Sequence, residues 1–416
     1  MAVAAVATVF FLFSVFFVDD IAEIMDKGSG NTAEYAAFVK YFIYILIVDA
    51  LAVIPFAKVR ADGRPLRYGM IKILNIFCFI GLNLFFIVLV PLVLKNNWAG
   101  ADWFSTWYRP QWIGYVFISN LAASIVTLLL LLPELLQLKL KYDSRLVKEM
   151  MLYSFPILIA NISFIINETV DKLFIDRLLP AGQAEQDLGI YGACAKLAIF
   201  LSIFVQAFRL GAEPFFFSHA KNKNAGETYS RIMNYFVIVI SVIFVALTAN
   251  IEILKYFIAG KASPEEQQLY WSGLNIVPVL LFGYVSLGIY MNLSIWYKLS
   301  DQTRFGLYIS GIGAALTIIL NLIFIPKYSY HAAAWISLTA YASMMIISYV
   351  LGQKNYPIPY NLRKNLAYLL ISVVLVVLSF VIFERNLIIG NLLLILFVIS
   401  IFWAERKELR QLLKSR

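Results

Sequence analysis

The chain alternates between long apolar stretches and short polar connections. Twelve stretches are long enough to cross a bilayer, because a helix needs about 20 mostly apolar residues to span the hydrocarbon. Backbone groups in lipid must be hydrogen-bonded within their own segment, so runs of this length predict membrane-spanning helices. Ten of the stretches contain no Asp, Glu, Lys or Arg: residues 1–18, 73–94, 110–133, 150–167, 232–251, 267–297, 305–326, 328–353, 365–383 and 386–404.

The other two stretches, 41–57 and 189–208, contain one charged residue each, Asp49 and Lys196. The composition agrees with a membrane protein, with 61% hydrophobic and 14% charged residues and a mean hydropathy of +0.79. Such values are atypical of soluble domains. We therefore predict an all-α polytopic membrane protein with about twelve transmembrane helices.

Lysine and arginine are distributed unevenly between alternate connections. Segments on the side of the N-terminus hold 22 of them, and segments on the other side hold 9. Lys and Arg are retained on the cytoplasmic side of short loops, so we predict that both termini are cytoplasmic. The net charge of +9 then reflects topology and attraction to anionic inner-leaflet lipid rather than a nucleic-acid partner.

The residues that usually carry catalysis or metal binding are sparse. Cys78 and Cys194 lie inside predicted spans, and the only histidines are His219 and His331. Their spacing predicts no disulfide, metal site or cofactor site. There is also no P-loop and no catalytic set. These absences favour a secondary transporter or lipid translocator, with a membrane-embedded enzyme as the rival class.

The spacing of the spans predicts five segments. Residues 1–133 form an N-terminal bundle of four helices, and 134–149 form a cytoplasmic amphipathic linker. Residues 150–353 form a six-helix bundle, which is followed by a further helix pair over 354–404. Residues 405–416 continue as a basic cytoplasmic tail, for which a solvated or lipid-facing role is expected.

Charges inside spans are candidate functional residues, because each costs about 2.5 to 3.5 kcal/mol on insertion scales and normally faces water or a partner. Lys196 lies about 10 Å inside its helix, so we expect either a cavity residue or half of a structural ion pair. Asp49 is a shallower candidate of the same kind. Lys72 is close enough to the membrane surface for its ammonium group to reach it.

Two further clusters have helical spacing. Glu168, Asp171 and Lys172 are three and four residues apart, so one helical face is expected to carry all three. This face is either a gating or coupling site or an exposed, salt-bridged helix end. Arg209 and Glu213 are four apart at the end of the Lys196 helix, and we expect Glu213 to orient Arg209.

Pro156 and Pro278 lie inside predicted spans. Each removes one amide donor and frees a carbonyl one turn earlier, which favours a kink. The kinks are either flexing elements of a transport cycle or static features of packing.

Three segments resemble one family. They are LGIYGACAKLAIFLSIFVQAFRLGAEPFFFSHAKN (188–222), VDALAVIPFAKVRADGRPLRYGMIKILNI (48–76) and YSFPILIANISFIINETVDKLFIDRLLP (153–180). The chain resembles the polysaccharide, or O-antigen type, flippases of the multidrug/oligosaccharidyl-lipid/polysaccharide (MOP) exporter superfamily, which includes the MATE transporters. The resemblance implies a MATE-like fold of two helical bundles in a V, alternating access, and a role in surface polysaccharide or lipopolysaccharide biosynthesis.

The resemblance also implies a substrate, an oligosaccharide linked to polyprenyl pyrophosphate, in a bacterial inner membrane. Membrane lipids and polysaccharide polymerase machinery are the implied partners, and no catalysis is implied. Lys196 and Arg209 would contact the pyrophosphate, with Glu213 orienting Arg209. Pro156 and Pro278 would flex. The candidates for lining, gating or coupling are Asp49, Lys72, Glu168, Asp171 and Lys172.

The chain departs from the family at its N-terminus. Members commonly have fourteen helices in groups of six, six and two, whereas four helices precede the linker here. The first two helices are therefore expected to be missing, through either a mis-called gene start or natural shortening. The alternatives to a flippase are a multidrug or cation antiporter of the same superfamily, which would need a more acidic cavity, and a truncated, non-transporting member.

Overall fold

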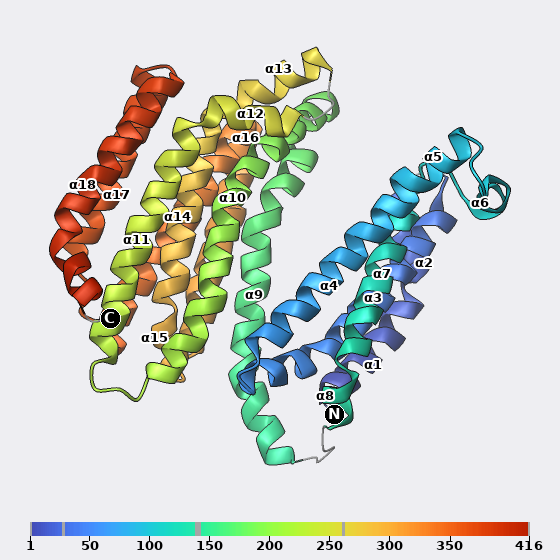
Figure 1. Cartoon of the computed structure of the whole chain (residues 1–416), viewed down its shortest axis with the longest axis horizontal. Coiled ribbons are helices and arrows are strands. Elements are labelled where there is room, and N and C mark those ends of the chain that lie inside the picture. The colour runs from blue at the N-terminus through green and yellow to red at the C-terminus, as the bar shows by residue number, and fades with distance from the viewer. Residues whose placement is uncertain (1, 27–29, 138–142, 260–262, 415–416) are drawn as a thin grey trace. The chain divides into compact units, whose positions relative to one another are not determined.

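The computed structural model describes residues 2–26, 30–137, 143–259 and 263–414 (Figure 1). Within these ranges the regular structure is helical and there is no β-strand. In the described part of the chain, nine helices are long and apolar enough to cross a membrane: Thr32–Ala61, Pro65–Lys95, Ser144–Leu178, Gly182–His219, Ala225–Ala249, Pro264–Leu299, Arg304–Asn355, Leu362–Ile382 and Leu387–Arg406.

The twelve predicted stretches all fall on these helices and on two shorter ones. Arg304–Asn355 contains two predicted spans, because Ser329 has non-helical backbone angles (φ 47°, ψ −133°) and divides the helix. The shorter apolar helices Val6–Phe16 and Gly114–Leu130 account for the remaining two. The prediction of an all-α polytopic membrane fold is confirmed.

The chain divides into two compact units, Met1–Lys148 (unit 1) and Glu149–Arg416 (unit 2). The helices that begin in unit 1 are α1 (Ala2–Phe16), α2 (Val18–Asp26), α3 (Thr32–Ala61), α4 (Pro65–Leu84), a π-helical turn (Phe85–Leu89), α5 (Val90–Lys95), α6 (Ala101–Trp107), α7 (Gly114–Leu130), α8 (Leu132–Leu136) and the first residues of α9 (Ser144–Leu178).

Unit 1 is organised around α7, which packs against both α3 and α4. The amide of Asn75 on α4 donates a hydrogen bond to Thr127 Oγ1 on α7 (2.9 Å), which satisfies two polar groups between apolar helices. On α8, Glu134 is buried and accepts a hydrogen bond from Arg67 Nη2 at 2.9 Å. Glu134 therefore packs into unit 1 instead of lying on a surface helix.

The structure covers the predicted linker only in part. Residues 138–142 of the 134–149 segment lie outside the described residues. Residues 134–136 belong to α8, and residues 144–149 form the first turns of α9.

Unit 2 continues from α9. Its other helices are α10 (Ala181–His219), α11 (Ala225–Ala249), α12 (Ile251–Ala259), α13 (Pro264–Ser272), a 3₁₀ turn (Gly273–Ile276), α14 (Val277–Leu293), α15 (Ile295–Leu299), α16 (Arg304–Asn355), α17 (Leu362–Val377), a π-helical turn (Leu378–Ile382) and α18 (Leu387–Lys414).

The core of unit 2 centres on α14, which packs against α10, α11 and α16. Close approach depends on Gly288. A Cβ atom there would lie 2.8 Å from both Phe236 Cζ and Val205 Cγ2, so a larger residue would push α14 away from α10 and α11. Small residues at helix interfaces are the usual means of close packing in membranes.

The C-terminal helices α17 and α18 pack beside α11 (Figure 1). Glu405 of α18 is buried, and it pairs with Lys364 Nζ of α17 at 2.8 Å and accepts a hydrogen bond from Tyr368. The amides of Asn250 and Asn391 donate to each other at 3.1 Å. The helix pair is therefore tied to the core of unit 2 by polar contacts at separate positions.

The two prolines predicted to kink spans behave differently. Pro156 lies within α9, which continues on both sides of it. Pro278 lies in the first turn of α14, directly after the 3₁₀ turn Gly273–Ile276. A proline in a first turn removes an amide that has no intrahelical acceptor, so the irregular segment precedes Pro278.

We expect Gly288→Ala to lower the melting temperature of the detergent-solubilised protein, because overpacking a close helix contact costs about 1 to 3 kcal/mol. The matched control is Gly311→Ala. Gly311 also lies in a helix, but nothing is within 4 Å of the added Cβ. The control should keep or raise the melting temperature, because alanine favours the helix by up to about 1 kcal/mol. Equal effects of the two substitutions would contradict the close packing of α14.

Candidate functional site

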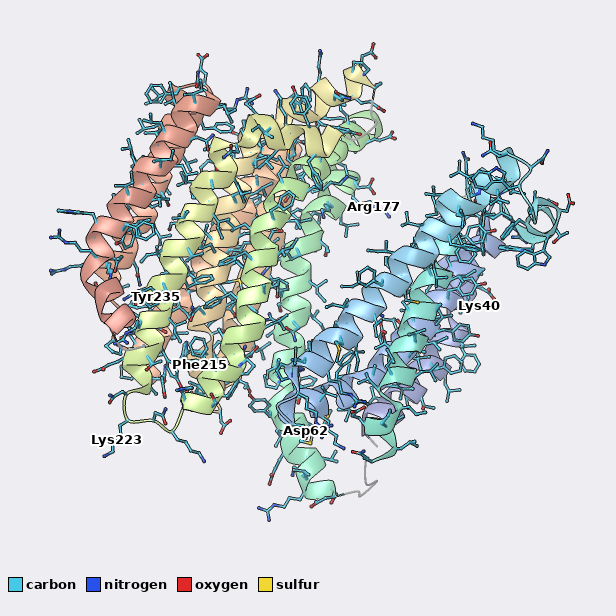
Figure 2. The ribbon with its side chains drawn as sticks, viewed as in Figure 1. Lys40, Asp62, Arg177, Phe215, Lys223 and Tyr235 are labelled. Carbon is cyan, nitrogen blue, oxygen red and sulfur yellow. The ribbon has the colours of Figure 1, made fainter. Side chains whose placement is uncertain are left out.

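A pocket of about 350 Å³ opens within unit 2. It lies where α9 begins in this unit, α10 ends, α14 passes into α15 and α16 begins. In Figure 2, the labelled residues Phe215 on α10 and Lys223 on the connection to α11 lie at this end of unit 2. Arg177 lies at the opposite end of α9. The polar side chains that line the pocket are Tyr153, Asn161, Arg209, Glu213, Tyr290, Ser294, Tyr297, Lys298, Thr303 and Ser310.

Arg209 enters the pocket from α10 and is half-buried. Its Nε atom is buried and has no hydrogen-bond partner among the described residues. A buried guanidinium N–H without an acceptor is costly. The Nε donor of Arg209 is therefore unsatisfied within the described residues.

Glu213, one turn after Arg209, forms an ion pair with Lys298 Nζ of α15 at 2.7 Å. This replaces the prediction that Glu213 orients Arg209, because the carboxylate is directed to a cation from another helix. The side chains of Lys298 and Glu213 are 20% and 34% exposed, so the pair is only partly screened by solvent. The pocket thus holds two cations and one carboxylate.

The position of Lys298 follows from the packing of α15. The indole of Trp296 is buried against Gly352 of α16, where a Cβ atom would lie only 2.9 Å from the ring. The hydroxyl of Tyr290 lies 3.4 Å from the hydroxyl of Tyr297 and 3.2 Å from Ser310 Oγ. These contacts hold α15 in place, and Lys298, which lies in α15, is therefore held on the wall of the pocket.

A second polar cluster lies deeper in unit 2, around two acids of α9. Asp171 is 1% exposed, and its carboxylate accepts hydrogen bonds from Tyr191 OH (2.9 Å), Ser337 Oγ (2.6 Å) and Asn321 Nδ2 (2.8 Å). Glu168 accepts hydrogen bonds from the hydroxyls of two further residues, Tyr284 (3.1 Å) and Tyr341 (2.7 Å). The cluster joins α9 to α10, α14 and α16.

The structure contradicts the prediction that Glu168, Asp171 and Lys172 share one face. Asp171 is buried, Glu168 is half-buried and Lys172 is exposed. An exposed, salt-bridged helix end is therefore excluded for the two acids. One turn before Asp171, Asn167 continues the buried stripe and accepts a hydrogen bond from Thr317 Oγ1 at 2.8 Å.

Lys196 lies apart from both clusters. It is exposed on the surface of unit 2, next to Ile199 and Phe200, which are also exposed. It makes no ion pair with any residue that the structure describes, so the structural ion pair is not found within those residues. Lys196 precedes Arg209 by about 20 Å along α10 and does not line the pocket.

The candidates of unit 1 are both exposed. Asp49 lies on α3 and has no ion-pair partner in the described part of the chain. Lys72 lies on α4 with its Nζ atom 4.6 Å from the centroid of the Phe56 ring, which is cation–π geometry.

Three polar residues of these clusters are not conspicuous in the sequence. Lys298 directly follows the apolar stretch 267–297, and Asn321 and Ser337 lie within apolar stretches. The available signal was polarity inside a span, since such groups need partners from other helices.

Residues 156–323 match the MatE family model. A search of the curated proteins finds no match. The matched segment contains Asp171, Arg209, Glu213, Lys298 and Asn321.

Two solved structures have a similar fold. The lipid II flippase MurJ in its inward closed conformation has a TM-score of 0.59 and 14% identity, over 96% of this chain and 82% of that one. A point mutant of the Vibrio cholerae MATE transporter VcmN has a TM-score of 0.63 and 14% identity, over 85% of this chain and 76% of that one. The fold is therefore that of multi-pass membrane transporters of the MATE type.

We expect the Glu213–Lys298 pair to show energetic coupling in a double-mutant cycle. Glu213→Gln should destabilise the protein more than Lys298→Met, because it leaves Arg209 and Lys298 together without a carboxylate. The double variant should be more stable than the sum of the single losses predicts, by about 1 kcal/mol. Thermal unfolding in detergent measures all four proteins. Additive losses would show that the pair has no energetic role.

Proposed function

We propose that the protein translocates a polyprenyl-diphosphate-linked oligosaccharide across the bacterial inner membrane, with both termini in the cytoplasm. The observation that carries this proposal is the pocket of unit 2, which holds Arg209 and Lys298 against a single carboxylate, Glu213. Charges within a membrane-spanning bundle are costly and normally face a partner or a water-filled cavity. An excess cation at such a site favours an anionic ligand.

A phosphate group suits this pocket better than a cation does. Charge-assisted hydrogen bonds from a guanidinium to phosphate oxygens are strong and geometrically selective. The hydroxyls of Tyr153 and Ser310 and the amide of Asn161 add neutral donors and acceptors of the kind that sugar hydroxyls require. The lining therefore suits a headgroup with both phosphate and saccharide character.

The comparisons with known proteins support a membrane transporter but do not identify its substrate. One structural relative is, by its name, a flippase of lipid II, and another is a MATE transporter. At 14% identity these relatives support a transporter fold and leave the substrate open. The choice of a lipid-linked substrate rests on the charge of the pocket and on the resemblance of residues 188–222 to polysaccharide flippases.

In this proposal the cations act at different depths. Arg209 binds the diphosphate, and Lys298 is a second cation held by Glu213. Lys196, about 20 Å before Arg209 along α10, contacts the headgroup at another stage of transit. Asp49 and Lys72 of unit 1 line the route, and the Pro156 and Pro278 segments flex as access alternates between the two sides.

Glu168 and Asp171 are proposed to gate the cycle or couple it to a proton or other cation, with Lys172 on their exposed side. A buried carboxylate without a neighbouring cation is expensive. Asp171 is held by three neutral donors, and the Oδ1 atom of Asn321 beside it is buried with no partner among the described residues. Binding of a proton or cation would relieve both groups, so occupancy could bias the packing of α9 against α16.

The product of this translocation would be used in surface polysaccharide or lipopolysaccharide (O-antigen) assembly, with polysaccharide polymerase machinery as a partner and membrane lipids around the helices. A multidrug or cation antiporter remains the rival function of this fold. The rival requires a net negative substrate site, whereas the residues that line this pocket carry one more positive than negative charge.

The direct test is Arg209→Gln in proteoliposomes, with fluorescent undecaprenyl-diphospho-N-acetylglucosamine as the probe and its accessibility to a membrane-impermeant quencher as the readout. We expect the translocation rate to fall at least about tenfold, since a lost charge-assisted contact costs about 1.5 to 3 kcal/mol. Arg209→Lys should retain part of the rate. Lys196→Ala should also lower it, and an unchanged rate would remove Lys196 from the route.

Arg231→Gln is the matched control. Arg231 is an exposed cation on α11 and does not line the pocket. It should translocate the probe at the wild-type rate. Equal rates for Arg209→Gln and the wild type would contradict the proposed function. Transport of a cationic dye by both proteins would then favour the antiporter.

Asp171→Asn tests the coupling role separately. The amide has nearly the same shape as the carboxylate but carries no charge, so translocation of the same probe should lose its acceleration by an imposed proton or sodium gradient. Asp176→Asn, on the same helix but half-exposed, should keep that acceleration. A normal gradient response in Asp171→Asn would exclude Asp171 from coupling.

A further inference from the structure

Helix α16 folds back on itself at Ser329. A Cβ atom on Gly313 would lie 2.5 Å from the Sδ atom of Met344, so the segments before and after Ser329 lie side by side. A continuous helix would place these two residues about 45 Å apart along its axis. We call residues 304–328 the first arm of α16 and residues 330–355 the second arm, and Ser329 forms the turn between them.

The two arms meet at Asp171, and the turn lies midway between the residues that they contribute. Asn321 of the first arm and Ser337 of the second arm donate hydrogen bonds to the Asp171 carboxylate, at 2.8 Å and 2.6 Å. Ser329 is eight residues from each donor along the chain. The conformation of the turn therefore sets the register in which the arms present their donors to Asp171.

The backbone of Ser329 is strained. Its angles, φ 47° and ψ −133°, lie in a region that residues with a side chain rarely adopt. Such a conformation costs free energy and persists only where the surrounding structure stabilises it. Ser329 is only 8% exposed, so the stabilising contacts come from neighbouring helices.

Asp187 of α10 provides one of these contacts. Its Oδ2 atom accepts a hydrogen bond from Ser329 Oγ at 2.5 Å and another from Gln183 Nε2 at 3.1 Å. The contact with Ser329 has the length of a charge-assisted bond from a hydroxyl to a carboxylate, which is stronger than a bond between neutral groups. Asp187 is 9% exposed, so water competes little for this bond.

The same face of α10 also contacts Asp171. Tyr191 lies one turn after Asp187 on that face, and its hydroxyl donates a hydrogen bond to Asp171 at 2.9 Å. One face of α10 therefore binds both the turn of α16 and the carboxylate that the two arms share. A shift of α10 against the turn would change both contacts together.

We infer that Asp187 is a positioning residue for the cluster around Asp171. By binding Ser329 it stabilises the strained turn, and the turn holds the two arms of α16 so that Asn321 and Ser337 reach Asp171 together. This inference rests on the proposed coupling role of Asp171. It adds the Asp187–Ser329 hydrogen bond as the contact through which a change at Asp171 is passed between α10 and α16.

The experiment compares Ser329→Gly with Ser329→Ala in the full chain. Both substitutions remove the hydroxyl, but only glycine adopts this backbone without strain, and alanine at a positive φ destabilises by more than the added chain entropy of glycine. Ser329→Gly should therefore have the higher melting temperature in detergent. A lower or equal melting temperature would contradict a strained turn.

Both variants should lose the acceleration that an imposed proton or sodium gradient gives to translocation in proteoliposomes, with fluorescent undecaprenyl-diphospho-N-acetylglucosamine as the probe. Loss of this response in the stable glycine variant would separate positioning from folding. Ser329→Gly with a wild-type gradient response would overturn the inference.

Substitutions of Asp187 test the other side of the contact. Asp187→Ala should lose the gradient response, whereas Asp187→Asn should retain part of it, because its carbonyl oxygen still accepts from Ser329. Glu185→Ala is the matched control, since Glu185 is an exposed acid of the same helix turn, and it should respond as the wild type does.

A thermal double-mutant cycle of Asp187→Ala and Ser329→Gly gives a readout that does not depend on transport. Both substitutions remove the same bond, so the double variant should melt at a higher temperature than the sum of the single effects predicts. Additive effects would contradict the contact.

The possible failures are distinguishable. If Asp171→Asn loses the gradient response while Asp187→Ala and Ser329→Gly keep it, the positioning role is wrong and the proposed function stands. If the wild type translocates the probe without a gradient response, the coupling role of Asp171 and the positioning role of Asp187 are both contradicted, and the proposed translocation stands. If the wild type does not translocate the probe, the proposed function itself fails, and the positioning role fails with it.

Discussion

The structure of unit 2 depends on one constraint: a polar group placed among apolar helices must find a partner from another helix. Asp171 meets it with three donors from α10 and α16, and Glu405 meets it with Lys364 and Tyr368. Arg209 does not meet it completely, because its Nε atom is buried without an acceptor among the described residues. In the proposed function, an external ligand would supply acceptors to the guanidinium of Arg209.

In the proposed transport cycle, the two polar regions of unit 2 would have different tasks. The pocket around Arg209 has an excess of positive charge and opens at the end of α10, which suits capture of an anionic headgroup. The cluster around Asp171 is buried and lies between α9 and α16, which suits a change of packing in response to a proton or cation. Both regions use α9 and α16, so movement of these helices would link binding to gating.

The sequence predicted the fold, and it supplied several residues of the candidate site. Hydrophobic length alone located all twelve stretches, because the bilayer imposes the same requirement on every span. The rarity of charges in or near spans also indicated Arg209, Glu213, Glu168 and Asp171 as candidate residues. The sequence could not find Lys298 or Asn321, since their contacts join helices distant in sequence. For the same reason, helical spacing wrongly placed exposed Lys172 on the face of buried Asp171.

The central claim is that the pocket of unit 2 receives a diphosphate. The most direct measurement is a high-resolution structure of the full chain in nanodiscs that contain undecaprenyl diphosphate. The account predicts phosphate density within about 3 Å of the Arg209 guanidinium. Diphosphate bound elsewhere on the protein, with this pocket occupied by water alone, would contradict it.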